Sequence, residues 1–157
     1  ELNRSYESGK RLATLKIGYD IYDEIVLLDE DGTPVEELKV WSEEHPDARL
    51  LLRIKDMNED FLNQLRYELP ASKSDYIIEI DSFEMYYFVK SYGYEHIMLK
   101  VSDRDYTEDE LIDFLKAHST YGIILNPEKV SQRLKEEMNS LSTHLYIELN
   151  NSIQIFN

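Results

Sequence analysis

The sequence predicts an α/β fold built on a parallel β-sheet, and two observations carry this prediction. From residue 49 onward, short apolar segments alternate with helical patterns at a regular spacing. Polar or turn-forming residues bound each apolar segment, as expected of buried strands. Strand–helix–strand units of this kind normally place their strands parallel in one sheet.

Buried strands are expected at about six places in the chain, each short and rich in apolar or β-branched residues. In chain order these segments are Ile21–Leu28, Arg49–Ile54, Tyr76–Ile80, His96–Val101, Tyr121–Leu125 and His144–Leu149.

Helices are expected between these strands, because residues that begin helices precede amphipathic stretches. A first helix is expected over 35–46, between the first two strands. The next four helices begin at Ser, Thr or Asn residues whose side chains can accept a bond from the first helical turn. These predicted caps are Asn58, Ser82, Thr107 in a capping box with Glu110, and Asn126 followed by Pro127.

This alternation fits two architectures, an open doubly wound sheet and an incomplete or abbreviated TIM-type (β/α) barrel. No Gly-, Ser- or Pro-rich linker divides residues 1–157, so we expect a single domain, as a fragment of a longer protein. About six strands must either close tightly into a barrel or leave two open sheet edges. Open edges favour pairing with a protein partner or with a second copy of the chain.

The composition excludes several classes of function. The chain has 32 acidic and 17 basic residues, a net charge of −15, which disfavours binding to nucleic acid and to anionic lipid. No apolar run approaches the ~20 residues of a membrane span, so no direct membrane insertion is expected. The absence of cysteine excludes disulfides and thiolate metal sites.

The acidic segment Asp29–Gly32 raises the question of a metal site. A calcium-binding EF-hand loop needs an oxygen ligand at its first position and Glu at its twelfth. Leu27 and Leu38 occupy those positions, so the segment is interpreted as a turn. The four histidines are scattered and none follows a strand, which gives no candidate for general acid–base catalysis.

Candidate functional residues follow the predicted strands. The carboxyl ends of parallel strands meet at one edge of a sheet, where ligands bind. Lys55 and Arg53 are therefore weak catalytic candidates, although Lys55 could equally pair with a neighbouring carboxylate. Helix capping would account for two of the remaining residues. The ligand-binding candidates are Asp56, Ser82, Asn126 and Asn150, with Asp81, Asp103 and Glu148 at the same predicted edge.

The succession of these motifs resembles the glycerophosphodiester phosphodiesterase family. GYDIYDEIVLLDEDGTPV is similar to the family's second-strand segment, and LLLRIKD to its Ile-Glu-Ile-Lys strand. IDSFE is similar to a Ser-Ser-Phe-Asp segment, and the stretch over 121–151 to the closing run. The resemblance covers nearly the whole chain. It implies a (β/α) barrel with a divalent metal, calcium or magnesium, at the carboxyl ends of the strands.

Departures from the family pattern fall on the metal site. The resemblance places one metal ligand at Asp23 and two more at Ile25 and Arg53, which cannot bind a cation. The family's two catalytic histidines have no counterpart, whereas Lys55 and Asn150 are retained in kind. One carboxylate beside a guanidinium does not complete a divalent site, so Asp23 is only a weak metal candidate.

Three functional hypotheses follow. The leading one is a degenerate, non-catalytic domain that serves as a structural or protein-interaction module, in a bacterial protein that is membrane-associated or extracellular. The second is an active metal-dependent phosphoric diester hydrolase whose missing catalytic residues lie upstream of Glu1, with Arg53 binding phosphate. The third is an ordinary α/β protein that binds a small anionic ligand at helix N-termini.

Overall fold

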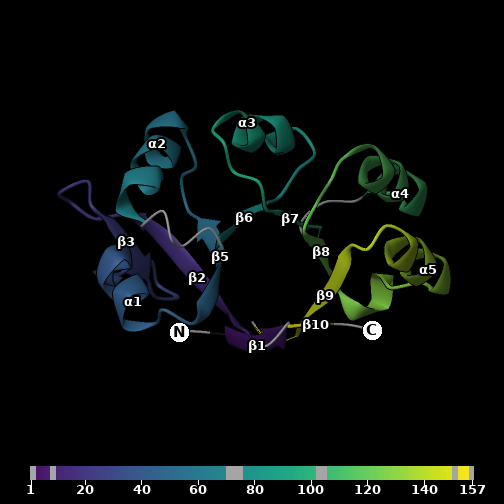
Figure 1. Ribbon diagram of the computed structural model, residues 1–157, viewed down its shortest axis with the longest axis horizontal. Coiled ribbons are helices and arrows are strands. Elements are labelled where there is room, and N and C mark those ends of the chain that lie inside the picture. The colour runs from purple at the N-terminus through teal and green to yellow at the C-terminus, as the bar shows by residue number, and fades with distance from the viewer. Residues whose placement is uncertain (1–2, 8–9, 70–75, 102–105, 150–151, 156–157) are drawn as a thin grey trace. The chain divides into compact units, whose positions relative to one another are not determined.

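A computed structural model describes residues 3–7, 10–69, 76–101, 106–149 and 152–155 (Figure 1). Side chains are described over the same ranges from residue 12 to residue 148. The chain divides into two compact units, Glu1–Ile78 and Glu79–Asn157, and each is described by itself.

The first unit is a sheet with two helices. Its strands follow the order β6-β5-β2-β3-β4, and β1 also pairs with β2. β2, β5 and β6 are parallel, whereas β1, β3 and β4 are joined in antiparallel hairpins. The elements are β1 (Asn3–Glu7), β2 (Lys10–Tyr19), β3 (Ile25–Leu28), β4 (Pro34–Glu37), α1 (Leu38–Glu44), β5 (Ala48–Ile54), α2 (Glu59–Glu68) and β6 (Tyr76–Ile80), within which the unit boundary falls.

The long strand β2 organises the first unit, and none of the predicted strands covers it. One edge of β2 pairs with β1 and then β3, while the other edge pairs with β5 over seven residues. Leu12, Ala13, Thr14 and Leu15 are all buried, so both faces of the strand are covered. A strand buried on both faces loses the alternation of apolar and polar residues that makes strands recognisable.

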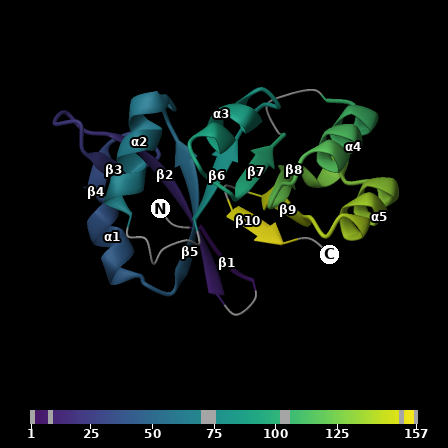
Figure 2. The same ribbon diagram turned by 45° about the horizontal axis from the view of Figure 1, so that its top comes forward.

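The second unit contains parallel strands separated by helices. Its strands follow the order β7-β8-β9-β10, parallel except for the terminal hairpin. Helices α4 and α5 lie side by side against β8 and β9 (Figure 2). The elements are α3 (Met85–Ser91), β7 (Ile97–Lys100), α4 (Glu108–Ala117), β8 (Gly122–Leu125), the 3-10 helix η1 (Pro127–Lys129), α5 (Gln132–Ser140), β9 (His144–Leu149) and β10 (Ser152–Ile155).

The predicted α/β class, with helices between mostly parallel strands, is confirmed, and so are two helix caps. The Asn58 side chain accepts a bond of 2.9 Å from Phe61 N. Thr107 and Glu110 form the reciprocal capping box, with bonds of 2.9 and 3.1 Å. Both caps lie directly before an apolar helical pattern, so local sequence sufficed to find them.

Three predicted helix starts were wrong. The first helix begins at Leu38 because residues 34–37 form strand β4. Ser82 is buried and does not cap α3, whose N-cap Glu84 makes no side-chain bond. Asn126 precedes only the short helix η1, again without a side-chain bond. The N-cap of α5 is Ser131, whose hydroxyl accepts 3.0 Å from Leu134 N.

No helix within the described residues is long and apolar enough to cross a membrane.

Candidate functional site

The first unit gathers several predicted site residues at one sheet edge. β2 and β5 run parallel with Ile17 opposite Ile54, and Lys55 N donates 2.9 Å to Ile17 O. The turn after β2, which contains Asp23, and residues Lys55 and Asp56 therefore leave the sheet at its carboxyl edge. Arg53 lies earlier, within β5 and opposite Lys16.

The remaining predicted site residues belong to the second unit. Ser82 is buried just after β6, and its carbonyl oxygen accepts 3.3 Å from Met85 N. Asn126 is partly buried after β8, and its carbonyl accepts 3.0 Å from Lys129 N. Asn150 and Asp103 lie outside the described residues. The structure therefore gives Ser82 and Asn126 roles in local turns.

Two acidic turns in the first unit share one hydrogen-bond pattern. In the β2–β3 turn, the Asp20 carboxylate accepts 2.8 Å from Tyr22 N and 2.9 Å from Glu24 N. In the β3–β4 turn, the Asp29 carboxylate accepts 2.9 Å from Asp31 N and 2.8 Å from Thr33 N. In both turns the backbone N–H of the aspartate also donates to the carbonyl oxygen four residues later, from Asp20 to Glu24 and from Asp29 to Thr33. The predicted Asp-Gly turn is thus confirmed, and a second turn with the same hydrogen bonds lies at Asp20–Glu24.

Asp23 and Gly32 occupy equivalent positions in these two turns. Asp23 has φ of 58° and Gly32 has φ of 80°, both in the left-handed region. Glycine adopts this conformation without strain, and aspartate tolerates it better than most residues. Asp23 is therefore a turn residue whose backbone closes the β2–β3 hairpin.

Contacts from α2 and β5 hold the two turns in place. Gln64 Nε2 donates 2.9 Å to the Asp23 carbonyl oxygen, and Tyr19 packs edge-on against Phe61 at 4.9 Å. A β-carbon built on Gly32 would lie 3.9 Å from Lys55 Nζ, so this cation lies beside the acidic β3–β4 turn. Burial, assisted by Asp60 and Asp23, raises the pKa of Tyr19.

The β2–β3 tip, residues Asp20–Glu24, displays two apolar side chains. Ile21 is 88% exposed and Tyr22 is 77% exposed. The turn bonds and Gln64 hold the backbone on both sides of this pair. Asp20, Asp23 and Glu24 flank this pair in the sequence. The tip thus exposes two apolar side chains on a hydrogen-bonded backbone, next to acidic residues.

Carboxylates of the acidic turns are already used by the fold. Asp20 and Asp29 each accept two backbone N–H bonds, a role that an ionised carboxylate fills without a metal. Within the described residues, no three His, Cys, Asp or Glu side chains are grouped to hold a metal ion. The carboxylates of Asp20 and Asp29 therefore serve the turns.

A partly buried ion pair in the second unit was not foreseen. Lys100 Nζ lies 3.4 Å from Glu148 Oε2, and both side chains are 19% exposed. Lys100, Ile124 and Tyr146 are register partners across β7, β8 and β9, so their side chains share one sheet face. The pair thus spans β8 close to the carboxyl ends of parallel strands. Strand pairing, which single segments do not encode, brings the two charges together.

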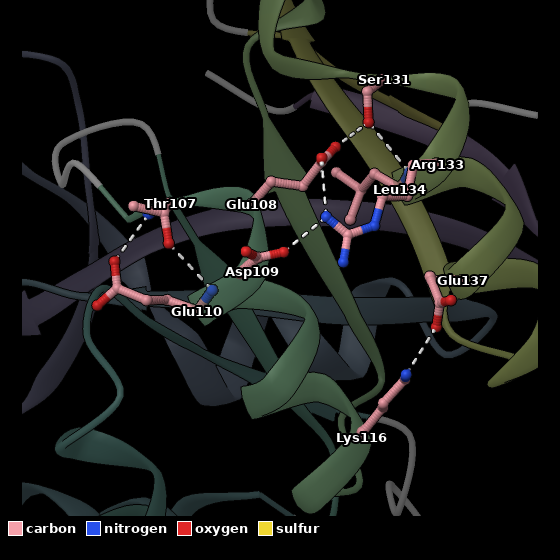
Figure 3. A network of polar contacts seen from close by, with 9 residues as sticks. All are labelled: Thr107, Glu108, Asp109, Glu110, Lys116, Ser131, Arg133, Leu134 and Glu137. Atoms are coloured by element: carbon pink, nitrogen blue, oxygen red, sulfur yellow. Dashed lines mark hydrogen bonds and ion pairs between the residues drawn. The ribbon is translucent and has the colours of Figure 1, made fainter.

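Helices α4 and α5 are linked by a polar network (Figure 3). The Ser131 hydroxyl donates to Glu108, and Arg133 Nη1 lies 2.6 Å from Asp109 Oδ1 and 3.4 Å from Glu108 Oε2. Lys116 pairs with Glu137 at 3.4 Å. Hydrogen bonding to Asp109 raises the pKa of Arg133. The contacts of Ser131 and Arg133 join the two helix N-termini, whereas Lys116 and Glu137 join the helices farther along.

An aromatic stack packs α3 against α4. Tyr106, Phe83, Phe114 and His118 stack with successive centroid distances of 3.9, 4.2 and 4.4 Å. His118 Nδ1 lies 2.9 Å from the Phe114 carbonyl and must donate to it. Nε2 lies 3.1 Å from the Tyr87 hydroxyl, which donates when the imidazole is neutral. His118 is thereby held in one orientation by packing and two polar contacts.

Comparison with known families, curated proteins and solved structures gave no match for this chain.

Proposed function

We propose that this chain is a non-catalytic protein-interaction module whose docking element is the β2–β3 tip. The observation that carries the proposal is the exposure of Ile21 and Tyr22 on a backbone held by the turn and by Gln64. An exposed aromatic residue next to an aliphatic one is typical of interface anchors. A fixed tip loses little conformational freedom when it binds, which favours affinity.

The chemistry of the tip specifies a basic protein partner. Three acidic residues, Asp20, Asp23 and Glu24, flank Ile21 and Tyr22 in a chain of net charge −15. A second copy of this chain would repel the tip, whereas a partner with Lys or Arg around an apolar pocket would be attracted. Rim charges act mainly on the association rate, and the apolar anchors supply most of the affinity.

Open sheet edges, the other predicted route to a partner, carry less weight in this proposal. The edge strand β4 has only four residues and begins with Pro34. Glu36 and Glu37 add negative charge, and a hydrogen bond between Glu36 and Glu44 raises the pKa of Glu36. Short, proline-containing and charged edges resist pairing with other strands.

The proposal retains the family resemblance as an explanation of the architecture. We infer that the chain is a degenerate glycerophosphodiesterase-like domain with an abbreviated (β/α) barrel. The alternation of parallel strands with helices supports this inference, as does the position of LLLRIKD on β5 and its loop. The use of Asp23 as a turn residue accounts for its retention without the other metal ligands.

The proposal is tested by site-specific cross-linking followed by a binding assay. p-Benzoylphenylalanine at position 22 should cross-link a basic protein in cells of the source organism. The same group at position 67 is the control, because Tyr67 is 92% exposed on α2 of the same unit. The purified partner should bind the double variant Ile21→Ser/Tyr22→Ser at least ~10-fold more weakly, a loss of roughly 1.4 kcal/mol. The variant Tyr67→Ser should bind normally, and equal binding by the tip variant would contradict the proposal.

Hydrolase activity, the second hypothesis, has a separate test. Glycerophosphocholine would be incubated with the chain in calcium or magnesium, and choline release measured. We expect no turnover above the buffer. Metal-dependent turnover that disappears in Lys55→Ala would favour the hydrolase over the interaction module.

A further inference from the structure

A second candidate site lies in the second unit, at the junction of α5 and β9. A groove of about 430 Å³ lies there, within the size range of small-molecule sites. Gln132, Lys135, Glu136 and Asn139 line one side, and Ser142 and His144 lie on the strand side. The four α5 residues follow i, i+3, i+4 and i+7, so they share one helix face.

The first unusual feature of the groove is the residue that ends α5. Thr143 N donates 3.1 Å to Met138 O and Ser142 N donates 3.2 Å to Asn139 O, which together form a Schellman motif. Its left-handed position is normally Gly, but here it is Ser142, with φ of 55°. The chain retains strained backbone at a residue that lines the groove.

The second unusual feature is a glycine inside a strand. A β-carbon on Gly122 would lie 2.6 Å from the His144 carbonyl oxygen and 3.2 Å from His144 Cβ. Glycine within a strand weakens the strand and marks a close approach by another group. Gly122 therefore leaves space for His144, which also packs at 4.9 Å from the Tyr121 ring. Gly122 thus lies behind His144, and both Ser142 and His144 line the groove.

We propose that this groove binds a neutral polyhydroxylated small molecule, such as a sugar or cyclitol. Lys135 and Glu136 are neighbours, so their charges offset each other inside an otherwise acidic chain. Amide and hydroxyl groups both donate and accept, which matches ligand hydroxyls that do the same. The ring of His144, with the side chains of Met138 and Leu145, supplies an apolar surface for the C–H face of a sugar. An anion would meet Glu136, and a cation would meet Lys135.

Amide NMR shifts of the full chain test this proposal. The probes are glucose, N-acetylglucosamine and myo-inositol at millimolar concentration, with inorganic phosphate and free lysine as charged comparators. At least one neutral probe should cause saturable shifts confined to residues 132–145. No saturable shift with any neutral probe, shifts elsewhere in the chain, or binding of a charged comparator alone would each overturn the proposal.

The variant Ser142→Gly separates binding from folding. Glycine relieves the left-handed strain, so the variant should melt at a higher temperature than the parent chain. Loss of the hydroxyl should weaken binding of the active probe by about 5-fold or more. Ser140→Ala, which removes an exposed hydroxyl outside the groove lining, is the matched control and should bind normally. A Ser142→Gly chain that binds as tightly as the parent would contradict the role given to this hydroxyl.

Discussion

Single residues stabilise the two acidic turns through their backbone conformation and through hydrogen bonds to backbone N–H groups. Asp20 and Asp29 have the same bonding role, and Asp23 repeats the left-handed conformation of Gly32. A left-handed residue other than glycine costs on the order of 1–2 kcal/mol, with Asp among the better tolerated. The side chain of Asp23 is therefore less important than the backbone angle it adopts.

Substitutions at position 23 separate these two contributions. Asp23→Gly and Asp23→Ala both remove the carboxylate, but only glycine adopts positive φ freely. We expect the glycine variant to be more stable than the alanine variant by about 1 kcal/mol in urea denaturation. Equal losses in the two variants would assign the role to the carboxylate instead.

Tyr86 predicts a response of stability to alkaline pH. Burial raises the pKa of Tyr86, and the neighbouring Tyr87 adds to the effect. Between the unfolded value near 10.0 and the higher folded pKa, the unfolded chain binds fewer protons. The contribution of Tyr86 is therefore fully present below pH 10 and is lost as pH rises above it. Burial raises the pKa of Tyr19 and Tyr76 in the same direction.

The variant Tyr86→Phe tests this response. The Tyr86 hydroxyl donates a hydrogen bond of 2.7 Å to the Ser119 carbonyl oxygen. Loss of this bond in the variant should lower the free energy of unfolding by about 1 kcal/mol at pH 7. The same variant should lose less stability than the parent chain between pH 9 and 11. Urea unfolding followed by circular dichroism across this range measures both effects. A decline as steep as that of the parent would exclude Tyr86 as a contributor.

Residue roles were predictable where a residue type signals a particular backbone conformation. Asp29–Gly32 was read as a turn because Asp-Gly is a strong turn signal. The equivalent turn at Asp20–Glu24 was missed, because Asp23 takes the left-handed position without a glycine to mark it. The ion pair of Lys100 and Glu148 depends on strand pairing, so no local pattern could reveal it.

Helix α5 shows how capping acts at the scale of an element. Its N-terminus is fixed by Ser131, which accepts from Leu134 N and donates to Glu108 at the start of α4. The Asn126-Pro127 pair predicts an earlier helix start, because Asn-Pro is a common opening of helices. In the structure, Asn126 and Pro127 begin the short 3-10 helix η1. Helix α5 begins five residues after Pro127, at Gln132, and its N-cap is Ser131.

Matched alanine variants test this assignment. Ser131→Ala removes the cap of α5 and its bond to α4, and should lower the free energy of unfolding by about 1 kcal/mol. Asn126→Ala removes a side chain that makes no cap bond to η1 and should change stability by less than half that amount. Urea denaturation of both variants gives the comparison. A larger loss of stability in Asn126→Ala than in Ser131→Ala would instead support the predicted cap at Asn126.

Elements were predictable from sequence when each was amphipathic and bounded by its own signals. Helices α2 and α4 meet this condition, with caps at Asn58 and Thr107. Strand β2 does not, because four successive residues from Leu12 are buried and the polar–apolar alternation disappears. The edge strand β4 was assigned to a helix, since its Val-Glu-Glu sequence continues into the helical pattern of α1.

For the whole molecule, the class of fold followed from alternation, but the arrangement of strands did not. Parallel pairing of β2 with β5 and of β7, β8 and β9 depends on contacts between distant segments. The net charge of −15 also belongs to this scale, and it predicts repulsion of nucleic acid. We therefore propose that the acidic turns serve folding and display, and that Asp23 belongs to no metal site.

The most direct test of that claim is a thermal melt of the parent chain and Asp23→Ala in calcium, magnesium or manganese. Sodium chloride at matched ionic strength is the control, because any salt screens repulsion in an acidic chain. We predict that divalent ions raise the melting temperature no more than the sodium control, and equally in both chains. A saturable rise at millimolar divalent ion that is absent in Asp23→Ala would show ligand-linked stabilisation through this carboxylate and contradict the account.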